Sequence, residues 1–211
     1  MLKFNGVQNQ LIDWNFSIDD PGFFTLPEDG RIYRGWKKGG HGKVDLDKAI
    51  VVSSNTYFFS LAYRSDIDDL AEHLSKFGFG KKVCLDCFDE DEGLIPSPQW
   101  KRNKLNSGWS RGDTVNLGVG QGYMVATPIQ LAYYSSILAK KGSMNALSLV
   151  QDTTDTLNST IGFNNFKNRD WAQLHKAMTD VIDSTEGTSR RLKNLKSFQV
   201  AAKSGTAELV S

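Results

Sequence analysis

Apolar residues recur at helical spacing in several segments, and the first two segments are close together in the chain. The first predicted helix starts after a capping residue, Asp45, and continues to about Tyr63. Its apolar side consists of Leu46, Ile50, Phe58 and Leu61. The second predicted helix runs from Asp66 to Phe77 and should end at Gly78, because glycine most easily adopts the left-handed conformation that closes a helix. Its apolar face consists of Leu70, Leu74 and Phe77.

A third predicted helix has the clearest start signal in the chain. Thr127 is a typical cap, Pro128 suits the first helical position, and Gln130 completes a capping box. Apolar residues then continue to Leu138, and Gly142 follows as a stop. We therefore predict one helix over this stretch.

The other segments predict one more helix, one strand and several irregular stretches. The helix covers Asp170 to Ser184, with Trp171, Leu174, Met178 and Val181 along one stripe. Ser197 to Val210 has the pattern of a strand. The opening to Gly42 is expected to consist of turns and extended pieces. Lys81 to Arg111 is expected to be a long irregular stretch, and Leu147 to Asn165 is weakly patterned. Helices followed by a strand indicate an α+β domain.

Composition is ordinary for one globular domain. The chain has 211 residues, of which 39% are hydrophobic and 23% charged, and its net charge is +1. This balance predicts no nucleic-acid partner. No segment approaches the run of about 18 apolar residues needed to span a bilayer, and Met1 to Asp20 is not built like a signal peptide. We expect nothing in these residues to export the chain or tether it to a membrane.

The two cysteines, Cys84 and Cys87, form a lone C-x-x-C. A zinc site needs two further ligands nearby, and a thioredoxin-like site needs a strand followed by a helix. The acidic, loop-like surroundings offer neither, so we expect two incidental thiols.

Two short polar motifs are candidates for chemistry. Ser53-Ser54-Asn55 interrupts the apolar stretch IVVSSNTYFFSLAY, where small polar side chains are costly unless they have partners or face a cleft. Lys203-Ser204-Gly205-Thr206 lies in the predicted terminal strand. There an ammonium and two hydroxyls can bind a carboxylate, and the missing side chain lets a ligand backbone approach closely. Each motif alone also occurs in ordinary helices and loops.

The two motifs together, in this order, match two of the three signature elements of penicillin-binding proteins and serine β-lactamases. Further segments resemble, in order and spacing, the penicillin-binding protein 2 family of class B, elongation-specific peptidoglycan D,D-transpeptidases. These segments are DPGFFTLP, YRGWKKGGHGKV, SSNTYFFSLAY, KFGFG, GLIPSPQWK, GDTVNLGVGQGYMVATPIQLA, EGTSRR and AAKSGTAE. The resemblance covers nearly the whole chain.

The resemblance implies the α+β fold of penicillin-binding transpeptidases and serine β-lactamases, with helices packed on an antiparallel sheet. In that family a serine attacks the penultimate D-alanine carbonyl of a peptidoglycan stem peptide. The resulting acyl-enzyme then passes its acyl group to an amine of a neighbouring stem. β-Lactams imitate the D-alanyl-D-alanine end and acylate the same serine. No cofactor is implied.

The same resemblance assigns roles to residues of this chain. The catalytic residues would be Ser53, Asn55 and Lys203, and the substrate-binding residues would be Ser204, Gly205 and Thr206. Ser53 would relay a proton towards the leaving amine, and Asn55 would hydrogen-bond the substrate amide. Lys203 would supply positive potential, and Ser204 and Thr206 would bind the substrate carboxylate. The Thr206 backbone N–H would form half of an oxyanion hole.

The third signature element, a serine followed three residues later by a lysine, does not occur in these 211 residues. In the family it lies upstream of the DPG stretch. We therefore expect residues 1–211 to be a partial transpeptidase domain that lacks this upstream segment and the C-terminal strands, and to be inactive by itself. The alternatives are a non-catalytic penicillin- or peptidoglycan-binding regulatory domain, and a relative of serine β-lactamases or penicillin sensors.

The resemblance also bears on metals, partners and location. The resemblance implies a zinc site of four residues in some relatives, of which Asp20 and His41 are kept here, whereas Gly35 and Ser54 occupy the other two places. We expect no tight metal site. The implied partners are peptidoglycan stem peptides, β-lactams and membrane proteins of the elongation machinery. The implied location of the full-length family is the periplasmic side of the inner membrane.

Overall fold

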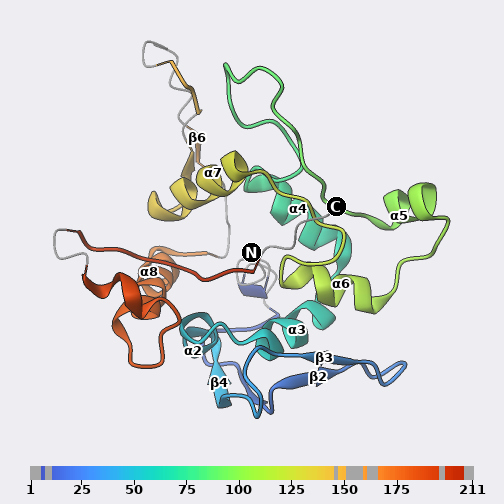
Figure 1. Cartoon of the computed structure of the whole chain (residues 1–211), viewed down its shortest axis with the longest axis vertical. Coiled ribbons are helices and arrows are strands. Elements are labelled where there is room, and N and C mark those ends of the chain that lie inside the picture. Colours follow the sequence, from blue (N-terminus) through green and yellow to red (C-terminus); the bar gives the residue numbers. More distant parts are fainter. Residues whose placement is uncertain are drawn as a thin grey trace.

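The computed structural model describes residues 6–7, 11–144, 147–150, 159–160, 166–194 and 198–206 (Figure 1). Its helices are α2 (Leu46–Val51), α3 (Asn55–Arg64), α4 (Ile67–Lys76), α5 (Pro98–Leu105), α6 (Arg111–Gly118), α7 (Pro128–Ala139), α8 (Asn168–Asp183) and the 3-10 helix η1 (Arg190–Asn194). Its strands are β1 (Ser17–Asp20), β2 (Phe23–Thr25), β3 (Ile32–Arg34), β4 (Gly42–Asp45), β5 (Ser143–Met144) and β6 (Ser159–Thr160).

The strands form small antiparallel pairs rather than one large sheet. β1 pairs with β4, β2 with β3, and β5 with β6. In the first pair Asp20 lies opposite Gly42, so the turn after β1 and the turn before β4 are neighbours. β4 leads directly into α2, whose start is capped by the Asp45 side chain. The strand pairs therefore place the segment of residues 21–41, which contains the β2–β3 hairpin, against α3 (Figure 1).

The core lies between the helices. α3 packs on α6, and α2 packs on α8. Large side chains that are almost fully buried include Tyr57, Leu61, Leu70, Phe77 and Ile137. Burying this apolar surface is the main favourable contribution to folding. α2 and α3 are thus held from two sides, by α8 and by α6.

Three of the predicted helices are confirmed. α4 is capped by Asp66 and is followed by Gly78 at φ 93°. α7 has the expected capping box between Thr127 and Gln130, and Gly142 follows it at φ 91°. α8 covers the fourth predicted segment, with Trp171, Leu174 and Val181 buried.

The single helix predicted from Asp45 to about Tyr63 is wrong. The chain forms α2, then leaves helical geometry at residues 52–54, and resumes as α3. Ser53 has φ 54°, in the left-handed region that interrupts a right-handed helix. The apolar spacing continues across this break, which explains why periodicity did not reveal it.

Lys81 to Arg111 is also not irregular throughout. It contains α5, capped by Ser97 with Pro98 in the first turn, and it leads into α6, which has a capping box between Ser110 and Asp113. Both helices are short and mostly polar, so they lack a clear apolar stripe. Their start signals were nevertheless present in the sequence.

The predicted terminal strand is not formed in the part that the structure describes. Residues 198–206 have no strand assignment, and residues 197 and 207–210 of the prediction lie outside the described residues. One backbone bond ties this segment down, from Ala202 N to Met178 O on α8. Most of the weakly patterned stretch 147–165 is likewise outside the described residues.

The expectation of two incidental thiols is wrong, because Cys84 and Cys87 form a disulfide with their Cα atoms 5.5 Å apart. Carboxylates shape this turn. Asp86 accepts hydrogen bonds from the backbone N–H groups of Leu149 and Val150, and Glu90 accepts from that of Cys84. The folded turn brings the two sulfurs together.

Among the described residues, no helix is long and apolar enough to cross a membrane.

Candidate active site

Two of the motif residues meet although 150 positions separate them in the chain. The Lys203 ammonium donates a hydrogen bond to Ser53 Oγ at 2.6 Å. It also donates to the carbonyl of Ser204 at 2.8 Å. The structure therefore brings the first motif and the last motif to one place.

Ser53 is presented by the junction between α2 and α3. Its backbone N–H donates to the Ile50 carbonyl, and the next N–H, of Ser54, donates to the Ala49 carbonyl. Ser54 then caps α3, since its hydroxyl accepts the backbone N–H of Tyr57. The junction is a tight turn with Ser53 half-buried at its corner, where the Ser53 hydroxyl meets Lys203.

Lys203 lies in an unusual electrostatic environment. Burial of its ammonium lowers its pKa from the ordinary value of 10.5 to about 8, because protein surrounds much of the charged form and no carboxylate in the described part of the chain pairs with it. Water still reaches part of this side chain. At neutral pH the amine is mainly protonated and supplies a positive charge next to Ser53.

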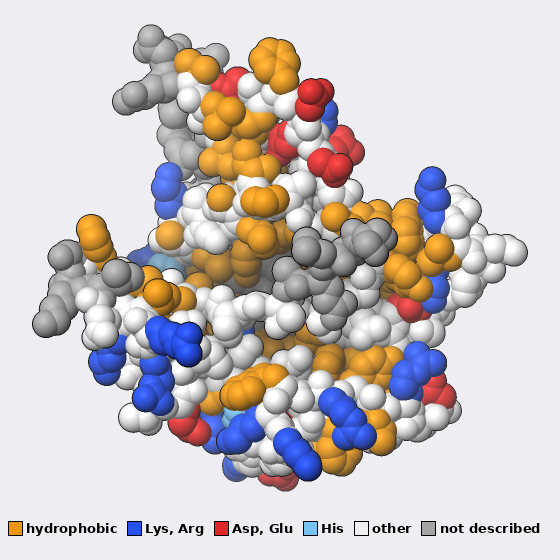
Figure 2. Space-filling view, in the orientation of Figure 1, with side chains coloured by type: hydrophobic (Ala, Val, Ile, Leu, Met, Phe, Trp, Pro, Cys, Tyr) orange, Lys and Arg blue, Asp and Glu red, His pale blue; other side chains and the backbone are white. Residues whose placement is uncertain are grey.

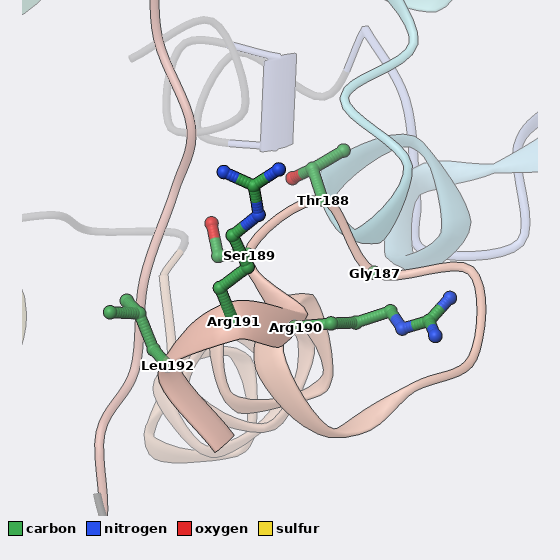
Figure 3. A pocket seen from close by; sticks show the side chains of 6 residues that line it. All are labelled: Gly187, Thr188, Ser189, Arg190, Arg191 and Leu192. Carbon is green, nitrogen blue, oxygen red and sulfur yellow. The ribbon is translucent and has the colours of Figure 1, made fainter. Parts of the chain in front are cut away.

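The neighbouring Ser204 contacts a residue that lines a cavity. Its hydroxyl shares a hydrogen bond of 2.8 Å with Thr188 Oγ1. Thr188 belongs to the loop between α8 and η1, and this loop together with the start of η1 lines a cavity of ≈ 580 Å³, from Gly187 to Leu192. Figure 3 shows the Thr188 hydroxyl and the Arg191 guanidinium on the same side of the loop, with Arg190 pointing away. Arg190 is instead bound to the Thr185 carbonyl.

The other motif residues have less defined surroundings. Asn55 is the first residue of α3 and is half-buried next to the Ser53 turn. Gly205 and Thr206 are exposed, and a side chain at Gly205 would meet no atom within 4 Å. The absence of a side chain leaves open space beside the backbone here. A ligand backbone can therefore approach this segment closely.

The places of the four zinc-binding residues of some relatives do not fit a metal ion here. One oxygen of Asp20 accepts the Ser54 hydroxyl at 2.6 Å, and the other accepts the Gly22 N–H at 2.7 Å. Gly35 has no side chain to offer. His41 Nε2 is buried without a hydrogen-bond partner in the described part of the chain, and burial, the largest influence, lowers the His41 pKa. One free imidazole nitrogen does not make a tetrahedral site.

Charges are distributed unevenly over the molecule. Figure 2 shows acidic side chains gathered near the tip of the long loop after α4, whose residues 86–92 are rich in Asp and Glu, and basic side chains spread over other parts of the same face. The cavity beside Ser204 is bordered by Arg190 and Arg191. An anionic ligand is therefore favoured at the cavity and disfavoured at the acidic loop.

The sequence did not reveal two residues that contact the turn at residues 52–54. They are Trp36 and, as a hydrogen-bond acceptor, Asp20. The Trp36 indole N–H reaches the carbonyls of Val52 and Ser53 at 3.1 Å each. Asp20 ends β1 and Trp36 follows β3, so both residues are remote from the motif in the sequence. The only sequence signal was the Gly-rich context YRGWKKGGHG, which indicates a loop shaped by close backbone contacts.

Comparison with known proteins gives one consistent result. The model of the penicillin-binding protein transpeptidase domain matches residues 2–211. The chain is 39% identical over 218 residues to the peptidoglycan D,D-transpeptidase MrdA of Acinetobacter baumannii, and 36% identical over 208 residues to that of Haemophilus influenzae. The two matches include 100% and 95% of this chain, but only 32% of each relative. The chain thus spans about a third of the length of these relatives.

Solved structures agree with the sequence matches. A Pseudomonas aeruginosa PBP2 crystal structure is similar with a TM-score of 0.91 and 36% identity, over 99% of this chain and 48% of that one. A complex of Helicobacter pylori PBP2 with MreC is similar with a TM-score of 0.90 and 29% identity, over 99% of this chain and 38% of that one. The fold of helices and small antiparallel sheets is therefore the one found in those structures.

Proposed function

The chain belongs to the penicillin-binding protein transpeptidase family, and we propose that it carries the substrate-binding half of the active site of a peptidoglycan D,D-transpeptidase of cell-wall elongation. The observation that carries this proposal is the hydrogen bond of 2.6 Å between Lys203 Nζ and Ser53 Oγ. It joins the serine-x-asparagine and lysine-serine-glycine motifs, whose contacting residues are 150 positions apart in the chain. The serine–lysine pair that would attack the substrate is not among these 211 residues.

The contact gives Ser53 and Lys203 complementary roles. Ser53 Oγ accepts a hydrogen from Lys203, so its own proton remains free to be donated. A hydroxyl held in this way can pass a proton to the amine that leaves when D-alanine is displaced. Lys203 stays where it is and stabilises negative charge near the reacting centre.

The segment after Lys203 would bind the terminal carboxylate of the stem peptide. Ser204 and Thr206 offer hydroxyls, and Lys203 adds a positive charge at one end. The hydrogen bond from Ser204 to Thr188, a residue that lines the cavity beside η1, supports a carboxylate position next to that cavity. The Thr206 N–H is assigned to the oxyanion hole, and Asn55 is assigned to the substrate amide.

A binding experiment tests this assignment without requiring catalysis. Amide resonances of residues 204–206 in the labelled chain should shift on addition of a peptide ending in D-alanyl-D-alanine, and should not shift with the same peptide ending in L-alanyl-L-alanine. The variant Ser204→Ala should lose the response. Ser135→Ala, which removes an exposed hydroxyl on α7 bound to the Leu131 carbonyl, should keep it. Equal shifts with both peptides, or no shifts at these residues, would refute the assignment.

Covalent labelling supplies an independent check. We expect no adduct between a fluorescent penicillin and this polypeptide, since none of its serines precedes a lysine by three positions. A stable adduct on Ser53 would mean that this residue is a nucleophile rather than a proton relay.

The partner and location follow the same proposal. The Helicobacter pylori PBP2 structure contains MreC, and this supports a place for the present chain among proteins of the elongation machinery. Its substrate side would then face the periplasm at the inner membrane. Peptidoglycan stem peptides and β-lactams are the small ligands we assign to it.

A further inference from the structure

We propose that Trp36 and the buried Asp20–Ser54 pair are positioning residues that hold Ser53 in a left-handed backbone conformation and thereby bring its hydroxyl to Lys203. The significance of this arrangement for catalysis rests on the proposed function. The geometry around Ser53 can be tested independently of the proposed function.

Ser53 needs such support because its conformation is intrinsically unfavourable. At φ 54° its Cβ crowds the backbone, and non-glycine residues other than Asn and Asp rarely adopt this region. Residues persist there when the surrounding structure fixes them, and they are common at functional sites. The neighbouring contacts should therefore include groups that act directly on the peptide units around Ser53.

Trp36 supplies the first such contact. Its indole N–H lies 3.1 Å from the Val52 carbonyl and 3.1 Å from the Ser53 carbonyl, so a single donor is shared by the two carbonyls that flank the Ser53 backbone. Trp36 is 59% exposed, and burial alone does not explain its position. Its ring is also packed against His41, with centroids 5.3 Å apart. The indole thus acts mainly through its polar atom.

The second contact fixes the residue that follows Ser53. Ser54 and Asp20 are buried, with 1% and 3% of their surfaces exposed, and their side-chain oxygens are 2.6 Å apart. The Ser54 hydroxyl donates to Asp20 and accepts the Tyr57 N–H, so its single hydrogen has a defined direction. Charge-assisted bonds of this kind are short and strong. Ser54 is held on the strand side and the helix side at once.

Residues 20–41, which include Asp20 and Trp36, make close backbone contacts with one another. Gly35 donates its N–H to the Gly22 carbonyl at 2.8 Å, next to Trp36. A Cβ on Gly40, at φ 70°, would lie only 1.9 Å from the Asp20 carbonyl oxygen. Glycine at position 40 therefore lets the chain before β4 lie directly against the Asp20 carbonyl, next to the side chain that binds Ser54. Asp20 and Trp36 both belong to the segment of residues 20–41, so one segment of the chain supplies both contacts to the Ser53 turn.

The test separates the hydrogen bonds from general packing. Trp36→Phe keeps a ring and removes the indole donor, while Ser54→Ala removes the hydroxyl and Ser54→Thr retains it. Trp109→Phe is the matched control, because that indole also donates one hydrogen bond, to Thr114, but does not contact Ser53. The readouts are the Ser53 amide-to-α-proton coupling, which reports φ, and the nuclear Overhauser effect between Ser53 β-protons and Lys203 ε-protons.

We expect Trp36→Phe and Ser54→Ala to change the coupling and to reduce the Overhauser effect at least about twofold, while Ser54→Thr and Trp109→Phe leave both as in the parent chain. Trp36→Phe should unfold at the same temperature as the parent, since its indole is largely exposed. If Ser54→Ala does not fold, Trp36→Phe decides alone. Unchanged coupling and Overhauser effect in folded Trp36→Phe would overturn the proposal. Failure of peptide binding would count only against the proposed function, because no ligand is used here.

Discussion

Residues 46–64 and helix α7 begin in the same way and then fold differently. Each follows a capping residue, Asp45 in one and Thr127 in the other, and each contains a long apolar stretch. α7 continues unbroken for 12 residues. Residues 46–64 divide into α2 and α3 at the Ser53 turn. The same local preference thus leads to two outcomes, and the deciding contacts come from elsewhere in the chain.

In α7 the remote contacts agree with the local signals. Gln130 completes the capping box by accepting the Thr127 N–H at 3.0 Å. Its amide also donates to the carbonyls of Lys81 and Glu92, at 3.0 and 2.8 Å. One fully buried side chain therefore caps its own helix and ties down the long loop after α4. At Ser53 the remote contacts oppose the local preference, because Trp36 and Asp20 favour a turn where periodicity favours a helix.

The largest expected effect on stability comes from removing the Gln130 side chain, which makes both the local and the remote contacts of α7. Gln130→Ala would leave two carbonyls and one N–H without their partner, and buried polar groups without partners are costly. We expect the free energy of unfolding in urea to fall by about 2 to 4 kcal/mol. Gln99→Ala, on the exposed face of α5, removes a similar amide that is bonded to Asn103, and it should change the free energy of unfolding by less than about 0.5 kcal/mol. Equal losses in the two variants would show that the buried amide has no special role.

The conflict at Ser53 should be visible in the opposite response of the two regions to glycine. Ser53→Gly and Ser53→Ala both remove the hydroxyl, but only glycine adopts φ 54° without steric cost. We expect Ser53→Gly to be more stable than Ser53→Ala by about 1 kcal/mol. Ala132→Gly, on the exposed side of α7, should instead lower stability by about 0.5 to 1 kcal/mol. Urea unfolding of the three variants measures both differences, and the comparison fails if glycine destabilises both sites equally.

This contrast explains how far the sequence could be interpreted. α4, α7 and α8 were predictable because caps, periodicity and tertiary packing agree in each of them. α5 and α6 carried start signals at Ser97 and Ser110 but little apolar periodicity, so periodicity alone missed them. The short strands β1 to β4 depend on pairing between remote segments rather than on local patterns. The break after α2 depends in the same way on contacts from the opening of the chain.

The candidate site likewise contains residues that local motifs reveal and residues that only remote contacts reveal. Ser53 and Lys203 could be selected from their motifs, and the structure places them in contact. Trp36 could not be selected, because an exposed tryptophan in a Gly-rich loop has many possible roles. The Cys84–Cys87 disulfide was also missed, since the turn that closes it is shaped by hydrogen bonds from residues 148–150 to Asp86. Motifs identify the residues that do chemistry, whereas the residues that position them are found by geometry.

The smallest expected effect concerns the charge on Lys203. Its pKa in the folded chain is about 8, below the value of about 10.4 for an unfolded chain. Between these two values the unfolded state binds a proton that the folded state does not, so stability should rise with pH across this window. Water reaches part of this side chain, and we expect a gain of less than about 1 kcal/mol.

Buried tyrosines act in the opposite direction at the top of that window. Burial raises the pKa of Tyr57 and of Tyr134, so above about pH 10 the folded state holds protons that the unfolded state releases, and stability falls. The variant Lys203→Met keeps these tyrosines and removes the amine. The difference in urea unfolding free energy between the parent chain and Lys203→Met should therefore shift in favour of the parent between pH 7.5 and 10, because the tyrosine contributions cancel. Lys104→Met, which removes an exposed lysine on α5, should show no such shift. A constant difference for Lys203→Met over this range would mean that the ammonium beside Ser53 is as well solvated as an ordinary surface lysine.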